Sequence, residues 1–336
     1  MSIRNLSSLT YSILDLATVI EGKTPADTFK RSVDLARHAE EWGYERYWFA
    51  EHHNMISVAS SATSLLIGHV AEKTERIRVG SGGIMLPNHS PLVIAEQFGT
   101  LATLYPDRID LGLGRAPGTD QLTAMAIRGD RFNSAHDFPT DVRKLQAYLS
   151  SSNSHAKVRA IPGEGTDVPI WILGSSTDSA YLAAAYGLPY AFASHFAPQQ
   201  LLAAIQIYRD NFKPSAQLQQ PYVMACVNAV VAETDAAAER LSTSLKQLFI
   251  GVISGKRQLL QEPVDTMDGI WNDMEEEAVH QMLAVSFIGG KESVKANLES
   301  FLHQTQVDEV MVTSHIYDHQ ARLKSYELFA EILKGG

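Results

Sequence analysis

Two adjacent histidines follow the second strand-like run of the chain. Arg46–Ala50 reads as a short buried strand, and Glu51, His52 and His53 come directly after it. Neighbouring residues of an extended chain point to opposite faces, so only one of the two histidines can face the interior of a sheet or barrel. A single metal ion therefore cannot bind both, and no third ligand is evident. A histidine at this place is either structural or a general base, and the strand end favours the base.

Three glycines interrupt the next strand-like run, Val79–Pro87, at Gly80, Gly82 and Gly83. Glycine weakens a strand, and it is retained where a ligand or a second stretch of main chain comes close. A flat ring system lying against the main chain would account for all three positions. A β-bulge is the alternative interpretation, and the residues alone leave both open.

A further glycine pair, Gly112-Leu-Gly114, precedes Arg115 in the run Ile109–Gly118. The pair resembles the start of a dinucleotide-binding fingerprint, but Pro117 stands where the third glycine is needed. No strand ending in an acid follows at the usual distance, so this match is weak. Arg115 can instead contact an anion or a flavin ring. An arginine that only faces solvent is an equally open alternative.

Hydroxyl residues gather behind the strand-like run Pro169–Leu173. A glycine and the cluster Ser175, Ser176, Thr177 and Ser179 lead into an alanine-rich helix. A strand, a tight turn and a helix N-terminus together collect main-chain N–H groups and a positive dipole end, which suit a phosphate. Ser176 can also serve simply as the N-cap, the commoner role of a single serine. The cluster favours phosphate binding.

Strand-like and helix-like runs alternate along most of the chain, which predicts an α/β fold. Several of the strands are continuous apolar runs, as expected for strands buried on both faces. Eight such strands, each followed by a helix, predict a (β/α)8 barrel with its site at the carboxyl ends of the strands. The candidate strands are Ser8–Leu14, Arg46–Ala50, Ile77–Leu86, Ile109–Leu113, Pro169–Leu173, Tyr190–Ser194, Tyr222–Val231 and Glu309–Thr313.

The alternation alone does not separate a closed barrel from an open doubly wound sheet. The barrel is favoured because no linker divides the chain and no complete dinucleotide fingerprint follows the first strand. We therefore expect one domain over residues 1–336. Gly251–Ile288 breaks the rhythm between the seventh and eighth strands, and an insertion of that length is typical of a lid or binding loop.

Composition and charge exclude several other classes of protein. The chain has 336 residues, a formal charge of −10 and no dense Lys/Arg cluster, which argues against nucleic acid and anionic membranes as partners. The single cysteine, Cys226, excludes an intramolecular disulfide. No apolar run approaches the roughly 20 residues of a membrane span. The polar N-terminal stretch lacks the core of a signal peptide, so we expect a cytoplasmic protein.

Taken together, the motifs resemble the bacterial luciferase-like monooxygenase family. The matching segments keep the family's order over nearly the whole chain, and the match is weakest in Arg131–Ala160 and Gly251–Phe287. The Glu-His-His and Val-Gly-Ser-Gly-Gly pair is the most specific part of the resemblance. The segments are Gly43–His53, Arg78–Leu92, Ala95–Phe98, Arg108–Arg115 and Leu173–Ser176.

The resemblance implies a TIM barrel that binds reduced FMN, usually as a homodimer, with the flavin supplied by a separate flavin reductase. It implies that His52 is the catalytic histidine and that a non-prolyl cis peptide at Gly82-Gly83 packs against the flavin ring. It also implies that Arg115 contacts the flavin or its phosphate. The phosphate-binding turn would hold the cofactor-binding residues Ser175, Ser176 and Ser179.

The chain departs from the family pattern in two places. Luciferase carries a cysteine just before the arginine, where this chain has Gly114. A second phosphate arginine has no clear match, and Arg128 and Arg131 are only candidates. These departures put light emission and a long-chain aldehyde substrate in doubt, while the general flavin site is unaffected.

Three functions are compatible with the sequence. The leading hypothesis is an FMN-dependent monooxygenase that uses reduced flavin and O2 to oxygenate a small organic substrate, with aldehydes among the candidates. The second is an F420-dependent oxidoreductase of the same fold that transfers hydride. The third is a non-catalytic flavin-binding protein. His52 at the catalytic position argues mildly against the third.

Overall fold

A closed barrel of eight parallel strands forms the centre of the molecule. The computed structural model describes residues 5–129 and 137–335. Around the barrel the strand order is β1-β2-β3-β4-β5-β6-β7-β9, and pairing of β9 with β1 closes the ring. The strands are β1 (Thr10–Asp15), β2 (Arg46–Phe49), β3 (Arg78–Met85), β4 (Ile109–Gly114), β5 (Ile170–Gly174), β6 (Tyr190–Phe192), β7 (Val223–Val231), β8 (Ser286–Gly289) and β9 (Glu309–Thr313). The predicted (β/α)8 barrel is therefore confirmed.

The strand β8 lies outside the ring of eight and was not expected from the sequence. It pairs with the last four residues of β7, from Asn228 to Val231. One edge of β7 pairs with β9 as far as Asn228, which lies opposite Thr313. The other edge pairs with β6 only as far as Ala225, and β8 pairs with this second edge beyond that point. The long strand β7 thus carries the insertion as well as the barrel. The predicted eighth barrel strand corresponds to β9.

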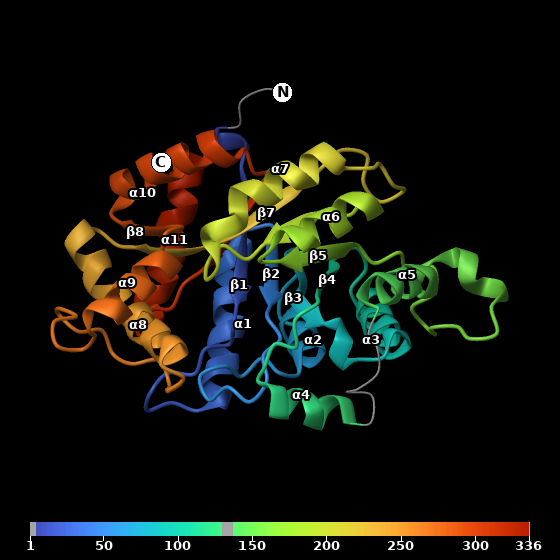
Figure 1. Cartoon of the computed structure of the whole chain (residues 1–336), viewed down its shortest axis with the longest axis horizontal. Helices are drawn as coiled ribbons and strands as arrows, with labels where there is room; N and C mark the ends of the chain where they lie inside the picture. The colour runs from blue at the N-terminus through green and yellow to red at the C-terminus, as the bar shows by residue number, and fades with distance from the viewer. Residues whose placement is uncertain (1–4, 130–136, 336) are drawn as a thin grey trace.

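Helices surround the strands, as Figure 1 shows. Local sequence explains where two of them begin: Thr24 caps the helix that follows it through a reciprocal capping box, and Pro91 opens the helix that ends at Leu104. The helices are α1 (Pro25–Glu41), α2 (Thr63–Ala71), α3 (Pro91–Leu104), α4 (Gln121–Arg128), α5 (Phe138–Leu149), α6 (Thr177–Tyr186), α7 (Leu201–Asn211), α8 (Asp235–Ile253), α9 (Asp273–Met282), α10 (Lys291–Thr305) and α11 (His319–Lys334).

Two separate apolar layers stabilise the barrel. The larger core lies between the strands and the helices, and a second cluster contains side chains from six strands, so it fills the barrel itself. Trp48 and Trp171 meet edge to face inside, with ring centroids 5.1 Å apart. The barrel is consequently a packed core, and only its two ends remain for polar groups.

An ion-pair network closes the amino-terminal end of the barrel. Arg46 contacts the Asp110 carboxylate at 2.8 Å and that of Glu309 at 3.2 Å, while Arg78 donates a second set of bonds to Asp110. Burial alone would raise the pKa of Asp110, but the charges of Arg46 and Arg78 outweigh it and lower that pKa. The acid Asp110, unassigned from the sequence, is thus a structural residue far from the carboxyl-terminal end.

The segment 251–288 is attached to the barrel rather than free. Leu260 is buried and exchanges two main-chain hydrogen bonds with the β1–α1 connection, to Val19 and Glu21. The main-chain N–H of Val264 donates to the Thr243 hydroxyl on α8 at 2.8 Å. Residues 254–258 between these anchors and α8 are exposed.

Candidate active site

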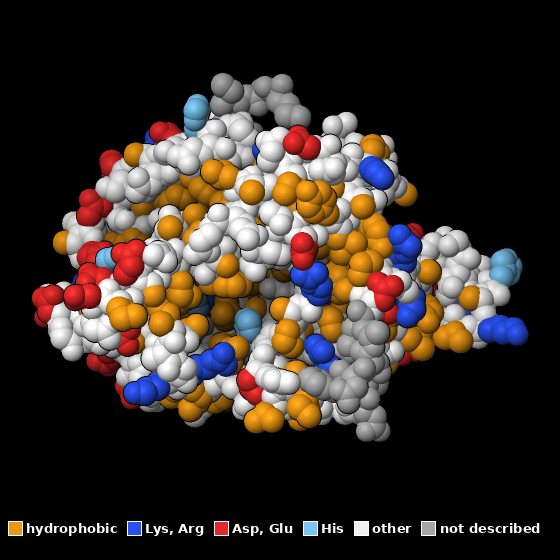
Figure 2. Space-filling model, in the orientation of Figure 1, with side chains coloured by type: hydrophobic (Ala, Val, Ile, Leu, Met, Phe, Trp, Pro, Cys, Tyr) orange, Lys and Arg blue, Asp and Glu red, His pale blue; other side chains and the backbone are white. Residues whose placement is uncertain are grey.

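One cavity at the carboxyl ends of the strands brings together every site residue predicted from the sequence. Its volume is about 220 Å³, and apolar side chains form much of its wall. Its lining includes His52, Gly82, Gly83, Arg115, Ser175, Ser176 and Ser179. These residues come from the ends of β2, β3, β4 and β5, as expected for an active site in this fold. Figure 2 shows a hollow on this face with histidine side chains inside it and Lys/Arg side chains near its rim.

His52 faces the cavity, whereas His53 turns away from it. The His52 Nδ1 lies 3.3 Å from the carbonyl oxygen of Gly118. Because a carbonyl oxygen only accepts, Nδ1 carries the proton in this contact, and Nε2 is left as the acceptor. Burial lowers the pKa of His52, and the nearby positive charge of Arg257 lowers it further. His52 is therefore a neutral imidazole at pH 7 and can accept a proton.

Glu51, an acid that the sequence left unassigned, holds this corner of the barrel together. The rings of His53 and His89 each place Nε2 2.8 Å from its Oε1, and the main-chain N–H of Met85 donates to its Oε2. Burial acts to raise its pKa, but these hydrogen bonds lower it to about 2. The carboxylate thus ties the end of β2 to the end of β3 and positions the main chain on either side of His52.

The glycines of β3 lie close to neighbouring strands of the barrel. A Cβ on Gly80 would lie 2.7 Å from the Trp48 indole nitrogen, and one on Gly82 would lie 2.7 Å from a Leu14 methyl. On Gly83 a Cβ would meet the Gly112 carbonyl at 2.6 Å. The barrel interior therefore leaves little room for a side chain at the three positions, as expected where a second stretch of main chain comes close, and the approach of a flat ring to them stays a prediction. Only Gly82 and Gly83 line the cavity.

The main chain of β3 has two unusual features near Gly82 and Gly83. The Gly82–Gly83 peptide bond is cis, as the resemblance implied. The pairing of β3 with β4 shifts register between Ser81 and Ile84, so the irregularity offered as the alternative to a ligand is also present. The predicted cis peptide and the predicted β-bulge thus both fall between Ser81 and Ile84, and the cavity borders this part of the strand at Gly82 and Gly83.

In the serine turn after β5, the Ser176 hydroxyl is not used as a helix cap, whereas the Ser179 hydroxyl is hydrogen-bonded within the protein. Ser176 is the N-cap of α6, but its side chain makes no capping hydrogen bond. By contrast, the Ser179 hydroxyl donates to the Ser176 carbonyl at 2.8 Å and lies 3.0 Å from the Tyr190 hydroxyl. Ser175 and Ser176, with the N–H groups of the first turn of α6, are thus better placed to bind an anion than Ser179 is.

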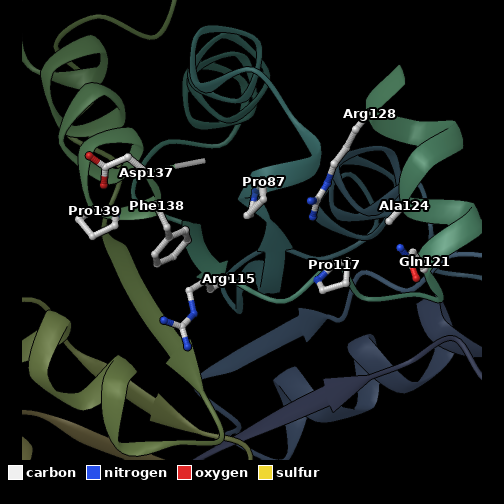
Figure 3. A pocket seen from close by; sticks show the side chains of 9 residues that line it. All are labelled: Pro87, Arg115, Pro117, Gln121, Ala124, Arg128, Asp137, Phe138 and Pro139. Atoms are coloured by element: carbon white, nitrogen blue, oxygen red, sulfur yellow. The ribbon is translucent and has the colours of Figure 1, made fainter. Parts of the chain in front are cut away.

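Arg115 stands at the edge of the cavity and is already paired. Its Nη2 lies 3.1 Å from the Asp178 carboxylate in the first turn of α6, and both side chains are more than 60% exposed. Arg115 also lines a neighbouring groove, in which Figure 3 shows it and Arg128 on opposite sides of Pro87 and Pro117. Arg128 donates to Asn88 at 3.0 Å and does not line the cavity itself. The other candidate arginine, Arg131, lies outside the described residues.

Two residues near His52 had no signal in the sequence. His195, three residues beyond the end of β6, lines the cavity, and burial with the charges of His315 and His52 lowers its pKa to about 3. Arg257 and His52 both line a second, open groove that meets the cavity at His52. No motif in the sequence marks His195 as a site residue, and only its position just after a barrel strand could have suggested that it lines the site.

The described residues hold neither a metal site nor a membrane-spanning helix. Within residues 5–129 and 137–335, no group of three or more His, Cys, Asp or Glu side chains is placed to hold a metal ion. No helix in the same ranges is long and apolar enough to cross a bilayer.

The chain is similar to a known sequence family and to individual proteins within it. The sequence model described as luciferase-like monooxygenase matches residues 10–309. A protein of Escherichia coli K12 named luciferase-like monooxygenase is 51% identical over 325 residues, covering 97% of both chains. An N-acetyl-S-alkylcysteine monooxygenase of Bacillus subtilis 168 is 30% identical, covering 95% of this chain and 97% of its own.

Solved structures share the fold over almost the entire chain. The crystal structure of apo-MsnO8 has a TM-score of 0.87 and 36% identity, and the match covers 97% of this chain and 98% of that one. An FMN complex of the oxygenating constituent of 3,6-diketocamphane monooxygenase from Pseudomonas putida matches with a TM-score of 0.71 and 17% identity, over 97% and 98% of the two chains. An F420-dependent secondary alcohol dehydrogenase has a TM-score of 0.66 at 14% identity, over 95% and 97%. At such identities the last two show the fold alone.

Proposed function

Because the chain belongs to the luciferase-like monooxygenase family, we propose that it is an FMN-dependent monooxygenase that uses reduced flavin and O2 to oxygenate a small organic substrate. One observation carries the proposal: His52, the Gly82–Gly83 peptide and the Ser176 turn, which lie far apart in the sequence, line one cavity. Reduced flavin, when bound, supplies the electrons that activate O2. The protein contributes binding, orientation and proton handling.

The cavity fits a phosphorylated flavin in its shape and its donors. Apolar side chains and the flat Gly82–Gly83 main chain suit a planar ring, and the unused Ser176 hydroxyl with the first turn of α6 suits a phosphate. Arg115 adds a positive charge at the same end. In this arrangement Gly82, Gly83, Arg115, Ser175 and Ser176 hold the cofactor, and Ser179 supports the turn through its hydrogen bonds.

His52 is the proposed catalytic residue. Its neutral ring and its Nδ1 contact with the Gly118 carbonyl leave Nε2 as a proton acceptor. Glu51 does not contact the proposed reacting centre, and it fixes the main chain around His52 instead. The role of His52 is therefore to hold and move a proton at Nε2 beside the bound cofactor and substrate.

The segment 251–288 is proposed to cover the site. Its exposed residue Arg257 lines the same open groove as His52, so the segment borders the entrance to the site. Anchors at Leu260 and Val264 keep the segment in place and leave residues 254–258 free to close over the open groove. Closure would exclude water from the cofactor during the reaction.

Two rival functions use the same cavity. The shared fold of the F420-dependent alcohol dehydrogenase keeps hydride transfer from F420 as the second candidate. The third candidate, a flavin-binding protein without catalysis, would need the cofactor site but not a proton-accepting His52.

The proposal includes two protein partners. A separate flavin reductase would supply the reduced FMN. A second copy of the chain would form a homodimer, for which the exposed Leu65 on α2 and Leu104 on α3 offer apolar surface. Sedimentation velocity of the purified protein measures the oligomeric state directly.

The function is tested with an FMN reductase, NADH and 18O2. Aldehydes, cyclic ketones and an N-acetyl-S-alkylcysteine form the substrate panel, chosen to span the chemistry of the relatives. We expect one 18O atom in the product of at least one substrate, only when the protein is present. Hydride exchange with reduced F420 and no 18O incorporation would instead establish the second function, and tight FMN binding without either reaction would establish the third.

A further inference from the structure

His195 carries hydrogen-bonding capacity that the rest of the protein does not use. Its ring lines the cavity, and its Nδ1 is buried without a hydrogen-bond partner among the described residues. No described residue bonds the other ring nitrogen, and the residue as a whole keeps some accessible surface. Buried polar atoms are nearly always partnered, so an imidazole of this kind beside a cavity indicates a missing partner.

The main chain at His195 is held from an adjacent strand. The Asn228 side-chain amide on β7 donates to the His195 carbonyl oxygen at 2.6 Å. The Phe196 ring packs edge to face on the imidazole, with ring centroids 4.8 Å apart. These two contacts fix the imidazole without using either of its nitrogens. Asn228 is therefore a positioning residue for His195.

The strand order places His195 one strand beyond the span assigned to the cofactor. The proposed flavin site runs from β3 through β4 to the turn after β5. His52 follows β2 on one side of this span, and His195 follows β6 on the other. In a ring of eight strands, β2 and β6 are four places apart and face each other across the mouth. A molecule between the two histidines would contact both.

We propose that His195 is a specificity-determining contact that hydrogen-bonds an uncharged oxygen group, such as a carbonyl, of an otherwise apolar substrate. This inference rests on the proposed function, since it gives the substrate class for the same site. The imidazole and the partly apolar wall formed by Leu14, Leu16 and Leu173 together define that class. A carbonyl oxygen would accept the ring N–H while its hydrocarbon part packs against the leucines.

An anionic group is disfavoured at this position. Burial and the nearby rings of His52 and His315 oppose a positive charge on His195, so the ring is neutral. Neither an arginine nor a lysine side chain hydrogen-bonds the ring among the residues that the structure describes. A carboxylate placed here would lose its hydration without gaining an ion pair, which is costly.

The test uses three ring compounds of similar shape on the FMN-loaded protein. Cyclohexanone carries the neutral oxygen, methylenecyclohexane lacks it, and cyclohexanecarboxylate replaces it with an anion. Saturation-transfer NMR gives the affinity of each, and FMN fluorescence quenching gives the affinity of the cofactor. We expect the wild type to prefer cyclohexanone. His195→Leu should lower the affinity for cyclohexanone about three- to tenfold, the usual effect of losing one neutral hydrogen bond. It should leave the affinity for FMN unchanged.

Controls separate a specific role from a structural one. His195→Gln, which keeps a side-chain N–H, should restore part of the ketone preference, and His303→Leu at an exposed histidine of α10 should change nothing. Equal binding of all three compounds, tightest binding of the carboxylate, or no binding of any compound would overturn the inference. A lower affinity of His195→Leu for FMN would overturn the inference as well, because His195 would then belong to the cofactor site.

The same data distinguish this inference from the proposed function. If wild-type protein fails to bind FMN, the proposed function fails, and the three-compound comparison on the FMN-free protein still decides whether His195 recognises the ketone. If FMN binds normally and His195→Leu leaves the ketone preference intact, the inference fails alone.

Discussion

His315, two residues beyond the carboxyl end of β9, should make the protein sensitive to mild acid. Its side chain is 4% exposed, and its Nδ1 lies 3.4 Å from the Thr18 hydroxyl. Burial, with the charge of Arg322, lowers its pKa from 6.5 to about 4. A histidine whose folded-state pKa is lowered binds protons better when the chain is unfolded. Its contribution to stability is therefore present above pH 6.5 and is lost as the pH falls.

The size of this loss follows from the two pKa values. At pH 5 the unfolded histidine is almost fully protonated and the folded one is almost fully neutral. Linkage between protonation and unfolding then gives a loss of about 2 kcal/mol between pH 7 and pH 5. The result is insensitive to the folded-state value, because any pKa well below 5 leaves the folded ring neutral. His195, with a pKa of about 3, adds a change of the same sign.

Urea unfolding of the wild type and of His315→Gln at pH 7 and pH 5 measures this effect. The measured quantity is the change in the free energy of unfolding between pH 7 and pH 5, compared between the two proteins. This comparison cancels any pH-independent cost of the substitution. It also cancels the contributions of the other titrating groups, including Glu309, whose raised pKa makes the protein more stable as the pH falls. We expect the variant to lose about 2 kcal/mol less than the wild type over this interval. Identical pH responses would refute the burial of a neutral His315.

Three further predictions concern the cofactor and the reaction. His52→Ala should retain FMN binding, measured by fluorescence quenching, while substrate oxygenation falls about 100-fold or more, as expected on removing a general base; undiminished turnover would exclude the catalytic role. Ser176→Ala should weaken FMN more than riboflavin in parallel titrations, and equal weakening would contradict a phosphate contact. Asp178→Asn releases Arg115 from an exposed ion pair worth at most about 1 kcal/mol. It should therefore tighten FMN binding up to about fivefold at low salt, whereas weaker binding would show that Asp178 supports the site.

The parts of the fold that could be predicted are those set by local pattern. Apolar strand-like runs that alternate with helix-like runs indicated the barrel, and the closed ring of eight strands formed as expected. The strand β8 was missed because Ser286–Gly289 is short and lies within an insertion without regular spacing. Its existence depends on the free edge of β7, which is a property of the assembled barrel rather than of those four residues.

The site residues that could be predicted were those with a distinctive neighbourhood along the chain. His52 stands in a Glu-His-His run and Ser176 in a serine cluster, and both line the cavity. Glu51 and His195 could not be assigned, because their partners come from other strands. Their positions became meaningful only when His89 and Asn228 were brought beside them.

The β3 glycines show that residue type alone can leave two explanations open. A ligand or a second stretch of main chain was expected beside them. The space beside them borders Trp48, Leu14 and the Gly112 main chain, and Gly82 and Gly83 also line the cavity. Residue type alone cannot distinguish an external ligand from an internal side chain that needs the same room. The cavity beside Gly82 and Gly83 was located correctly because strand ends in a parallel barrel meet at one face.

The central claim, that this cavity binds reduced FMN and controls its reaction with O2, is tested most directly by rapid mixing. Protein loaded with reduced FMN without oxygen is mixed with O2, and absorbance follows the return of oxidised FMN with and without the substrate panel. We predict that oxidised FMN returns more slowly than in buffer and that a substrate changes its rate. Reoxidation at the rate of free reduced FMN, unaffected by the protein, would contradict the account.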